Sequence, residues 1–233
     1  MRRGGFGSLP DPCLDLYVIT DRRWEGGRDP VEVAQAAIRG GATAIQLRYK
    51  ELPVRELLRV GRRLREVTRE HGVLFIVNDR ADLALALEAD GVHLGQDDLP
   101  LPAARRVVGP RLLIGVSVAD EGEALRAQRE GADYLGVGPI FATATKADAG
   151  APVGLERLRQ LRRVSHLPLV AIGGIGPKNA AQVVQAGADG VAVVSAVVGQ
   201  PDVAAAAAML ARQVRHGKDM RCYLAKAKGV AER

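Results

Sequence analysis

The sequence predicts a single-domain (β/α)8 TIM barrel, an α/β fold. Eight short apolar runs alternate with eight longer amphipathic stretches, and no long linker interrupts them. The chain has 233 residues, which suits one barrel because such domains run to roughly 250 residues. Apolar residues make up 47% of the chain and aromatic residues 3%. The core is therefore expected to consist mainly of Ala, Val, Leu and Ile, which suit parallel strands buried on both faces.

The expected strands are short runs rich in Val, Ile and Leu. Several follow a Gly-Ala-Asp sequence, as at 131–133 and 187–189. Glycine can end the preceding helix in a left-handed conformation, which needs no Cβ. In chain order the expected strands are Leu16–Thr20, Ala44–Arg48, Leu74–Asn78, Gly91–Leu94, Leu113–Val116, Tyr134–Val137, Leu169–Ile172 and Gly190–Val194.

A helix is expected after each strand. Prolines lie near several of the expected first turns, where a missing N–H costs little. The open doubly wound sheet is the alternative, but no Gly-x-Gly-x-x-Gly follows the first strand. The eight helices are expected after Asp29, Pro53, Arg80, Leu101, Asp120, Gly154, Pro177 and Pro201.

Both chain ends are expected to lie outside the barrel. We expect residues 1–13 to form a loose arm, 14–214 the catalytic barrel and 215–233 a basic, solvated tail. The net charge is +6, and much of it falls in that tail, which contains six basic residues and only two acidic ones, Asp219 and Glu232. The barrel itself is close to neutral, and aromatic residues that could stack on bases are few. No nucleic-acid partner is therefore expected.

The cysteine content and hydropathy favour a cytoplasmic protein. Cys13 and Cys222 lack the spacing of a zinc site or a disulfide framework. No apolar run approaches the ~18 residues of a membrane helix, so no membrane association is expected. The first dozen residues have no apolar stretch of the kind that a signal peptide needs.

Polar or glycine-rich residues follow nearly every expected strand. In this fold the active site lies at the carboxyl ends of the strands. Gln46, Arg48 and Lys50 alternate along the second strand, so they point to one face. Two cations and an amide at a strand mouth suit an anionic group such as pyrophosphate. A surface ion pair is the less favoured interpretation.

Carboxylates follow two neighbouring strands, where Asp79 closes the third and Asp98 the fourth. Together they suit Mg²⁺, which binds carboxylate oxygens and leaves places for phosphate oxygens. Asp79 also suits a helix N-cap, and Asp98 also suits a loop turn. Spacing alone does not choose between Asp97 and Asp98 as the second ligand.

The last two strands are followed by Gly173-Gly174-Ile175 and Val194-Ser195-Ala196. Barrels often bind a phosphate there through backbone N–H groups, although a tight turn would also use the glycines. Thr143, Thr145 and Lys146 lie in the longest strand-to-helix connection. Hydroxyls and a lysine there could bind a second phosphate, and a long loop could close over it. The alternative is a solvated loop without a binding role.

Three further residues have less specific roles. His93 lies within a strand and is expected to be packed there rather than to act as a base. Ser117 has no histidine at a recognisable triad position, so we expect it to hydrogen-bond a substrate. Trp24 is expected to pack in a loop.

Taken together, these segments resemble the thiamine-phosphate synthase family over about residues 14 to 210. The matching pieces occur in order and without gaps. They are Tyr17-Val-Ile-Thr-Asp21, Gln46-Leu-Arg-Tyr-Lys50, Val77-Asn-Asp79, Gly91-Val-His-Leu-Gly-Gln-Asp-Asp98, Gly115-Val-Ser117, Gly136-Val-Gly-Pro-Ile-Phe-Ala-Thr-Ala-Thr-Lys146, Ala171-Ile-Gly-Gly-Ile175 and Gly187-Ala-Asp-Gly-Val-Ala-Val-Val-Ser195.

The resemblance implies an Mg²⁺-dependent transferase that joins a pyrimidine diphosphate to a thiazole phosphate and releases diphosphate. It implies Asp79 and Asp98 as metal ligands, and Arg48, Lys50, Lys146 and Ser117 as catalytic residues. The pyrimidine diphosphate would contact Gln46, Arg48, Lys50, Asn78, Ser117 and Lys146. The thiazole phosphate would contact Thr143, Thr145, Gly174, Val194 and Ser195.

The chain departs from the family pattern at Tyr49, where the family usually has an acidic residue. The arm and the tail lie outside the family core. A thiazole tautomerase is the enzymatic alternative, but that branch lacks the full set of cations and carboxylates and often has histidine where Pro139 stands. A ligand-sensing or nucleic-acid-binding barrel is the non-enzymatic alternative. The sequence predicts neither whether the protein forms homo-oligomers nor whether it prefers the carboxylated thiazole.

Overall fold

The computed structural model describes residues 13–145 and 150–231, and from 228 to 231 it describes the helical backbone alone. The expected N-terminal arm therefore lies, apart from Cys13, outside the described residues. Lys146 lies outside them as well. Within the described ranges, no helix combines the length and apolar character needed to cross a bilayer.

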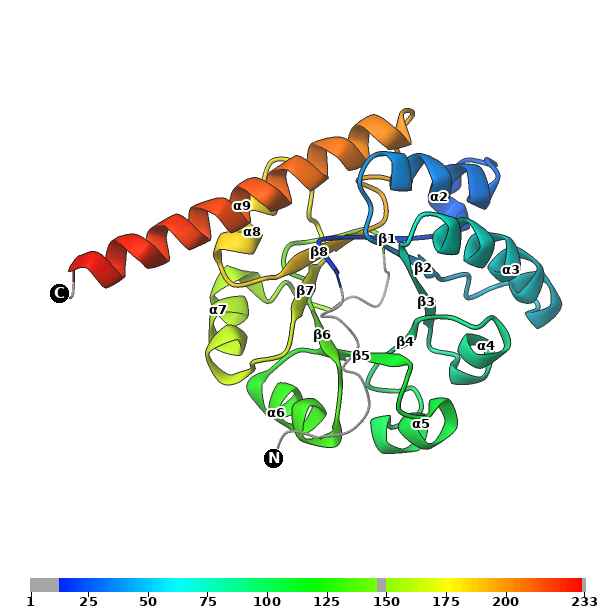
Figure 1. The fold of residues 1–233 in the computed structure, drawn as a ribbon, viewed down its shortest axis with the longest axis horizontal. Helices are drawn as coiled ribbons and strands as arrows, with labels where there is room; N and C mark the ends of the chain where they lie inside the picture. The colour runs from blue at the N-terminus through cyan, green and yellow to red at the C-terminus, as the bar shows by residue number, and fades with distance from the viewer. Residues whose placement is uncertain (1–12, 146–149, 232–233) are drawn as a thin grey trace.

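Eight parallel strands close into a barrel in chain order, and the last strand pairs with the first. The predicted (β/α)8 fold is confirmed, and Figure 1 shows the ring of strands inside a ring of helices. Most predicted boundaries lie within one residue of the observed ones, while β5 runs two residues further than predicted. The strands are β1 (Leu16–Ile19), β2 (Ala44–Leu47), β3 (Leu74–Asn78), β4 (Gly91–Leu94), β5 (Leu113–Val118), β6 (Tyr134–Val137), β7 (Leu169–Ile172) and β8 (Gly190–Val193).

A helix follows each strand, as predicted, and a further short helix, α1, was not predicted. Asp21 caps α1 by accepting a hydrogen bond from the Arg23 N–H, and Gly26 ends it. Four residues are too few to show a helical period. The helices are α1 (Arg22–Glu25), α2 (Pro30–Arg39), α3 (Val54–Glu70), α4 (Ala81–Ala86), α5 (Leu101–Val108), α6 (Glu121–Glu130), α7 (Gly154–Val164), α8 (Ala180–Gln185) and α9 (Val203–Ala231).

Where the structure describes it, the basic tail expected over 215–233 is the end of a helix, with exposed side chains at 222–227. Helix α9 continues unbroken to Ala231, and its end extends past the ring of the other helices (Figure 1). Lys218 bonds Asp15 at 2.6 Å, and Arg221 bonds Asp189 at 3.1 Å. These cations are therefore paired with the barrel, because the helix brings them against acidic residues that are distant in the sequence.

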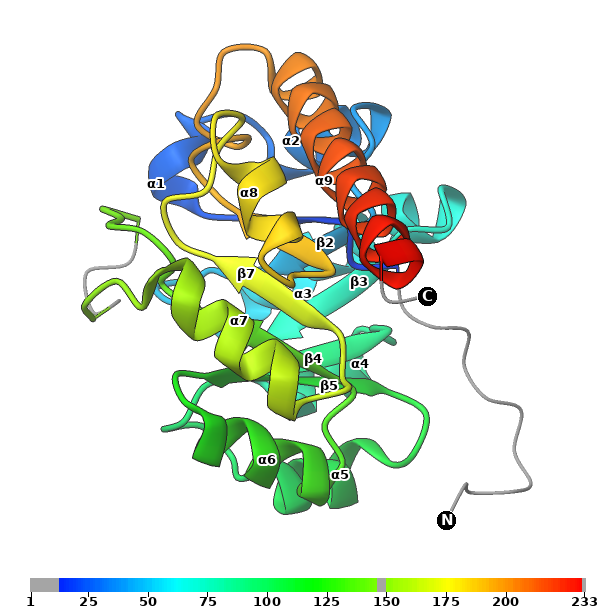
Figure 2. The same cartoon turned by 90° about the vertical axis from the view of Figure 1, so that its left-hand side faces the viewer.

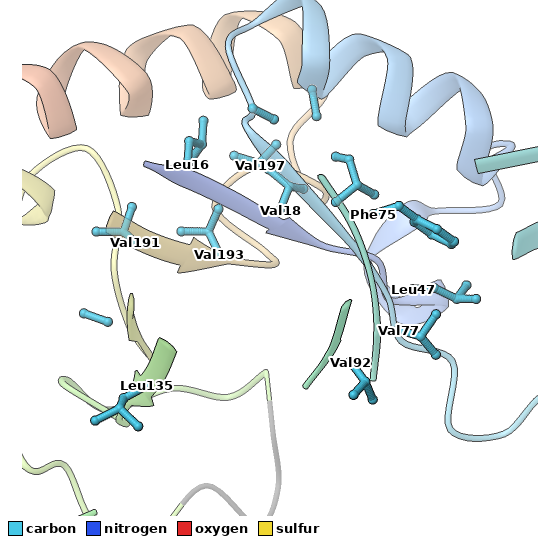
Figure 3. Packing of buried hydrophobic residues seen from close by; sticks show 14 of the residues in the cluster. Leu16, Val18, Leu47, Phe75, Val77, Val92, Leu135, Val191, Val193 and Val197 are labelled. Carbon is cyan, nitrogen blue, oxygen red and sulfur yellow. The ribbon is translucent and has the colours of Figure 1, made fainter. Parts of the chain in front are cut away.

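Side chains alternate between two apolar cores, one outside and one inside the strand ring. The outer core lies between strands and helices and includes Val18, Phe75 and Val191 (Figure 3). The inner core includes Tyr17 and Tyr134. As predicted, Ala, Val, Leu and Ile dominate the buried residues.

The inward-facing positions become polar toward the carboxyl ends of the strands. Gln46, Asn78, His93 and Ser117 occupy such positions on four consecutive strands and line the same cavity. Figure 2 shows that α1 and the connection after β6 lie at one end of the barrel. The fold therefore gathers polar side chains from distant parts of the chain at its carboxyl-terminal mouth.

Candidate active site

A cavity of about 1250 Å³ opens at the carboxyl ends of the strands. All eight strands, or the residues that directly follow them, contribute to its wall. Sites for a single small ligand usually measure about 300–1,000 Å³, so this cavity has room for two small substrates.

The cavity brings together every predicted site residue that the structure describes. Lys146 is the one predicted site residue outside the described part of the chain. The predicted residues that line the cavity are Gln46, Arg48, Lys50, Asn78, Asp79, Asp98, Ser117, Thr143, Thr145, Gly174, Val194 and Ser195.

One side of the mouth is cationic. Gln46 on β2 and Arg48 and Lys50 directly after it all line the cavity, as predicted, although the strand itself ends at Leu47. The Arg48 side chain is 14% exposed, and one of its N–H groups donates to Asp21 at 3.3 Å. The Gln46 amide nitrogen donates to the Tyr17 hydroxyl at 2.8 Å. The buried Gln46 Oε1 has no hydrogen-bond partner among the described residues, which leaves an acceptor for a ligand.

Two carboxylates meet beside these cations. The side chains of Asp79 and Asp98 are hydrogen-bonded, and Asp98 also accepts from the Gly95 N–H at 2.6 Å. Burial, followed by the hydrogen bond and charge of Asp98, raises the pKa of Asp79 to about 6, although Lys50 and Arg48 oppose that shift. Asp97 is exposed, and the contact with Asp79 is made by Asp98.

Asp79 precedes helix α4 without capping it. Its φ is +63°, a left-handed conformation that aspartate tolerates better than most side chains. Its N–H donates to the His93 carbonyl at 2.8 Å, which fixes it between β3 and β4. The N-cap of α4 is Arg80, with no side-chain cap. The interpretation of Asp79 as the N-cap of α4 is therefore wrong, because Arg80 holds that position and Asp79 has a left-handed backbone.

The donor set fits a magnesium ion. Two like charges held this close are unfavourable unless a proton or a cation lies between them. Mg²⁺ usually binds one or two carboxylates and completes its shell with water and phosphate oxygens. In residues 13–145 and 150–231, no group of three or more His, Cys, Asp or Glu side chains could hold a metal. The remaining ligand positions would therefore fall to water and substrate.

The other side of the mouth consists of hydroxyls and glycine backbone. The hydroxyls of Thr145 and Ser195 lie 3.3 Å apart, and the Thr145 N–H donates to the Thr143 hydroxyl at 3.2 Å. Gly174 has a φ of +63°, and a Cβ there would lie 2.6 Å from the Ala142 carbonyl. Only glycine fits this close approach, and the arrangement suits a phosphate.

A hydrogen-bonded chain that the sequence patterns did not reveal runs across the floor of the cavity. The Tyr17 and Tyr134 hydroxyls lie 3.2 Å apart, and the Tyr134 hydroxyl lies 3.1 Å from Nδ1 of His93. Nε2 of His93 lies 3.0 Å from the Ser117 hydroxyl. Burial raises the pKa of both tyrosines far above their usual value, so their hydroxyls stay neutral.

His93 is packed in its strand, as expected, with its ring 5.5 Å from that of Tyr134. It also lines the cavity. The period of two along β1, β4 and β6 was the signal that could have placed Tyr17, His93 and Tyr134 on the inner face. Trp24 belongs to α1 rather than to a loop, and it lines the cavity too.

The fold and this mouth define a (β/α)8-barrel enzyme of small-molecule substrates, since polar side chains converge there from all eight strands. Residues 16–197 match the family model described as thiamine monophosphate synthase. The chain belongs to the thiamine-phosphate synthase family.

Individual relatives agree with this assignment. The chain is 56% identical over 207 residues to the thiamine-phosphate synthase of Moorella thermoacetica, covering 89% of this chain and 99% of the relative. It is 57% identical over 195 residues to that of Chloroflexus aurantiacus, covering 84% and 90%. The solved structure of thiamine phosphate pyrophosphorylase from Pyrococcus furiosus superposes with a TM-score of 0.82 at 47% identity, covering 89% of this chain and 98% of that one.

Proposed function

We propose that the cavity carries out the thiamine-phosphate synthase reaction. In this reaction, 4-amino-2-methyl-5-(diphosphooxymethyl)pyrimidine condenses with 4-methyl-5-(2-phosphooxyethyl)thiazole and gives thiamine phosphate and diphosphate. With the carboxylated form of the thiazole, carbon dioxide is released as well. The observation that carries the proposal is the division of the mouth into a cationic side with two carboxylates and a side of hydroxyls and glycine backbone. Two phosphorylated substrates need two such anion sites in one cavity.

The cationic side would bind the pyrimidine diphosphate. Arg48 and Lys50 are placed to neutralise the diphosphate oxygens, and Asn78 and Ser117 are placed to donate to the same substrate. Lys146 joins this set by its place in the family motif. The free Oε1 of Gln46 suits the amino group of the pyrimidine, because that group carries N–H donors.

Asp79 and Asp98 would hold Mg²⁺ at the same side. Bound there, the ion supplies positive charge to the diphosphate oxygens. The carboxylate oxygens would orient that charge, while the half-buried setting of Asp79 limits screening by water. Both ligands follow neighbouring strands, β3 and β4, so the barrel itself sets their separation.

The hydroxyl side would bind the thiazole phosphate. Thr143, Thr145 and Ser195 present hydroxyls, and Gly174 and Val194 present backbone close to the cavity. With one substrate held at each side of the same cavity, the protein would contribute mainly by positioning the two substrates.

The reaction would proceed through a pyrimidine cation. The methylene C–O bond breaks and its electron pair leaves with the diphosphate, whose charge Arg48 and Lys50 stabilise. The lone pair of the thiazole nitrogen then forms the new C–N bond. That nitrogen carries no proton, so the attack needs no general base.

A coupled assay tests the proposed function directly. The full chain is incubated with both substrates and Mg²⁺, and diphosphate and thiamine phosphate are measured together. Release of both products in equal amounts, only when both substrates are present, is the expected result. Release of diphosphate from the pyrimidine substrate alone at the same rate would show a hydrolase instead.

Three matched variants test the metal ligands. Asp79→Asn and Asp98→Asn are expected to lower kcat/KM by about 100-fold or more, since each removes charge that positions the ion. Asp97→Asn, on the exposed neighbour, is expected to stay within about threefold of wild type. Equal losses for Asp97→Asn and Asp98→Asn, or full activity in a chelator, would show that the metal assignment is wrong.

A further inference from the structure

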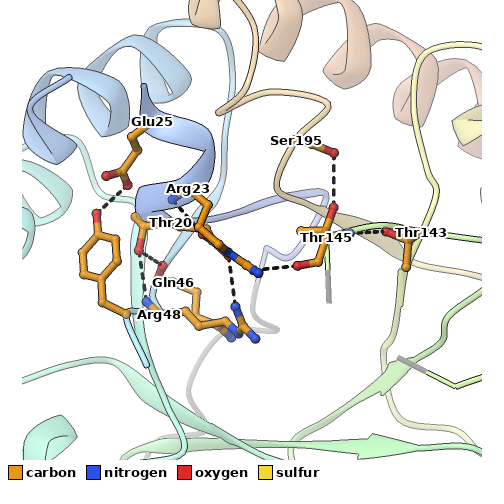
Figure 4. A network of polar contacts seen from close by, with 10 residues as sticks. Thr20, Arg23, Glu25, Gln46, Arg48, Thr143, Thr145 and Ser195 are labelled. Carbon is orange, nitrogen blue, oxygen red and sulfur yellow. Dashed lines mark hydrogen bonds and ion pairs between the residues drawn. The ribbon is translucent and has the colours of Figure 1, made fainter. Parts of the chain in front are cut away.

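The short helix α1 lies between the two sides of the mouth and contacts both. It begins directly after β1, and its N-cap residue Asp21 is 5% exposed. Figure 4 shows Arg23 of this helix between Arg48 and Thr145. Neither Asp21 nor Arg23 belongs to the substrate-binding residues assigned above.

Asp21 joins the cationic side to α1. It accepts two hydrogen bonds from the Arg23 guanidinium, at 3.0 and 2.7 Å, and one from Arg48 at 3.3 Å. Burial by itself would raise the pKa of Asp21, but the hydrogen bonds and charges of Arg23 and Arg48 lower it below its usual value. Asp21 is therefore a fixed negative charge that orients Arg48.

Arg23 continues this network to the hydroxyl side. The same guanidinium nitrogen that bonds Asp21 donates to the backbone carbonyl of Thr145 at 2.7 Å. Thr145 in turn contacts Ser195 through its hydroxyl at 3.3 Å. The carbonyl belongs to the connection that follows β6, so one arginine ties α1 to that connection across the mouth (Figure 4).

Helix α1 is itself held firmly, which makes it a suitable support. The Tyr49 hydroxyl, from the segment after β2, donates to the buried carboxylate of Glu25. Arg28 donates to the Glu25 carbonyl at 2.7 Å, to that of Gln200 at 2.9 Å and to that of Val198. The base of the Arg23 side chain is therefore fixed relative to both β2 and the segment after β8.

We propose that Asp21 and Arg23 are positioning residues that couple the two phosphate-binding sides of the mouth. Asp21 holds Arg48 at the diphosphate side, and Arg23 holds the Thr145 backbone so that its hydroxyl is oriented for the thiazole phosphate. The inference rests on the proposed function, because it concerns how that site is organised. A binding group held in place before the ligand arrives loses less entropy on binding.

The role of Arg23 is separable from a role in stability. Its side chain is 59% exposed, although that of its partner Asp21 is only 6% exposed. Arg23→Gln keeps an amide donor and leaves Arg48 beside Asp21, so we expect it to lower Tm by no more than about 4 °C, the effect of losing one weak ion pair in a chain of this length. Arg22 is the matched control, since it is the exposed neighbour on the same helix and its side chain makes no hydrogen bond with another described residue.

The experiment compares wild type, Arg23→Gln and Arg22→Gln by steady-state kinetics with each substrate varied in turn. Arg23→Gln is expected to raise the KM for the thiazole phosphate by about tenfold, the effect of losing one hydrogen bond from a charged donor. The KM for the pyrimidine diphosphate and kcat are expected to stay within about twofold, as are all constants of Arg22→Gln. A thiazole KM within twofold of wild type for Arg23→Gln, or equal increases for both substrates, would overturn the inference.

Calorimetric binding of the thiazole phosphate alone separates this inference from the proposed function. Arg23→Gln is expected to bind it about tenfold more weakly than wild type and Arg22→Gln. Equal binding by wild type and Arg23→Gln, including no binding by either, would refute the coupling. Failure of wild type to release diphosphate with both substrates present would refute the proposed function, whatever the calorimetry shows.

Discussion

Replacing Gly115 by alanine should disrupt the floor of the cavity. Gly115 on β5 pairs with Tyr134 on β6. A Cβ at position 115 would lie 2.0 Å from Cζ of Tyr134 and within 2.5 Å of both neighbouring ring carbons. Non-bonded carbons prefer about 3.5–4.0 Å, so the ring must move by roughly 1.5 Å or more. Tyr134 is fully buried, so it can move only by displacing neighbours or by entering the cavity.

The cost follows from two effects. Forcing one extra carbon into a packed core costs about 1–3 kcal/mol. A movement of that size also breaks the hydrogen bonds of the Tyr134 hydroxyl with Tyr17 and His93, now 3.2 and 3.1 Å long, at about 1 kcal/mol each. Gly115→Ala is therefore expected to lower the free energy of unfolding by about 3–5 kcal/mol.

Urea unfolding followed by circular dichroism measures this loss, and a double-mutant cycle identifies its source. In a Tyr134→Leu background the ring is absent, so Gly115→Ala should cost less than about 1 kcal/mol. In a Tyr134→Phe background the ring remains, so the overpacking cost should persist. A loss below about 1 kcal/mol in the wild-type background, or the same loss with Tyr134→Leu, would refute the reasoning.

Three further predictions concern α1, the phosphate side and α9. Burial raises the pKa of Glu25 above 4.5, so the protein loses stability as the pH rises through that raised pKa. Tyr49→Phe removes the hydroxyl that donates to the Glu25 carboxylate. Urea unfolding should show that this variant lowers the free energy of unfolding by about 1–3 kcal/mol at pH 8 but by little at pH 4. A loss of stability that does not depend on pH would contradict this prediction. Gly174→Ala adds a Cβ 2.6 Å from a carbonyl and should weaken calorimetric binding of the thiazole phosphate by about tenfold or more; unchanged binding would remove Gly174 from that site. Deleting residues 222–233 should leave turnover within about twofold, because the described side chains after Arg221 are exposed. Arg221→Ala should lower Tm, because it loses the bonds of Arg221 to Asp189 and to two backbone carbonyls. An equal fall in Tm on deleting 222–233 would contradict this prediction.

The fold and most of the site were predictable because both follow local patterns. Alternating apolar runs and amphipathic stretches predict the barrel, and polar residues after the strands predict its mouth. A period of two predicted Gln46, Arg48 and Lys50 on one face, and all three line the cavity, although Arg48 and Lys50 follow the end of β2. Gly174 follows β7, as predicted, and its positive φ fits both a phosphate site and the alternative of a tight turn.

The misses have a common physical cause. Helix α1 is too short to show a period, and the continuation of α9 depends on packing and ion pairs with Asp15 and Asp189. One alternative that spacing left open, Asp97 or Asp98 as the partner of Asp79, also depends on loop geometry, and there Asp98 makes the contact. In each case a tertiary contact decides the outcome.

The sequence by itself determined a (β/α)8 barrel whose polar strand ends form one mouth, because strand and helix periods and turn residues act over short stretches of chain. Only the tertiary structure decided which side chains meet there. Tyr17 and Tyr134 are 117 residues apart, and Arg23 and Thr145 are 122 apart. Barrel closure brings β1 beside β8 and brings Tyr17 on β1 within reach of Tyr134 on β6, so the cavity floor and the link between its two sides exist only once the whole ring has formed.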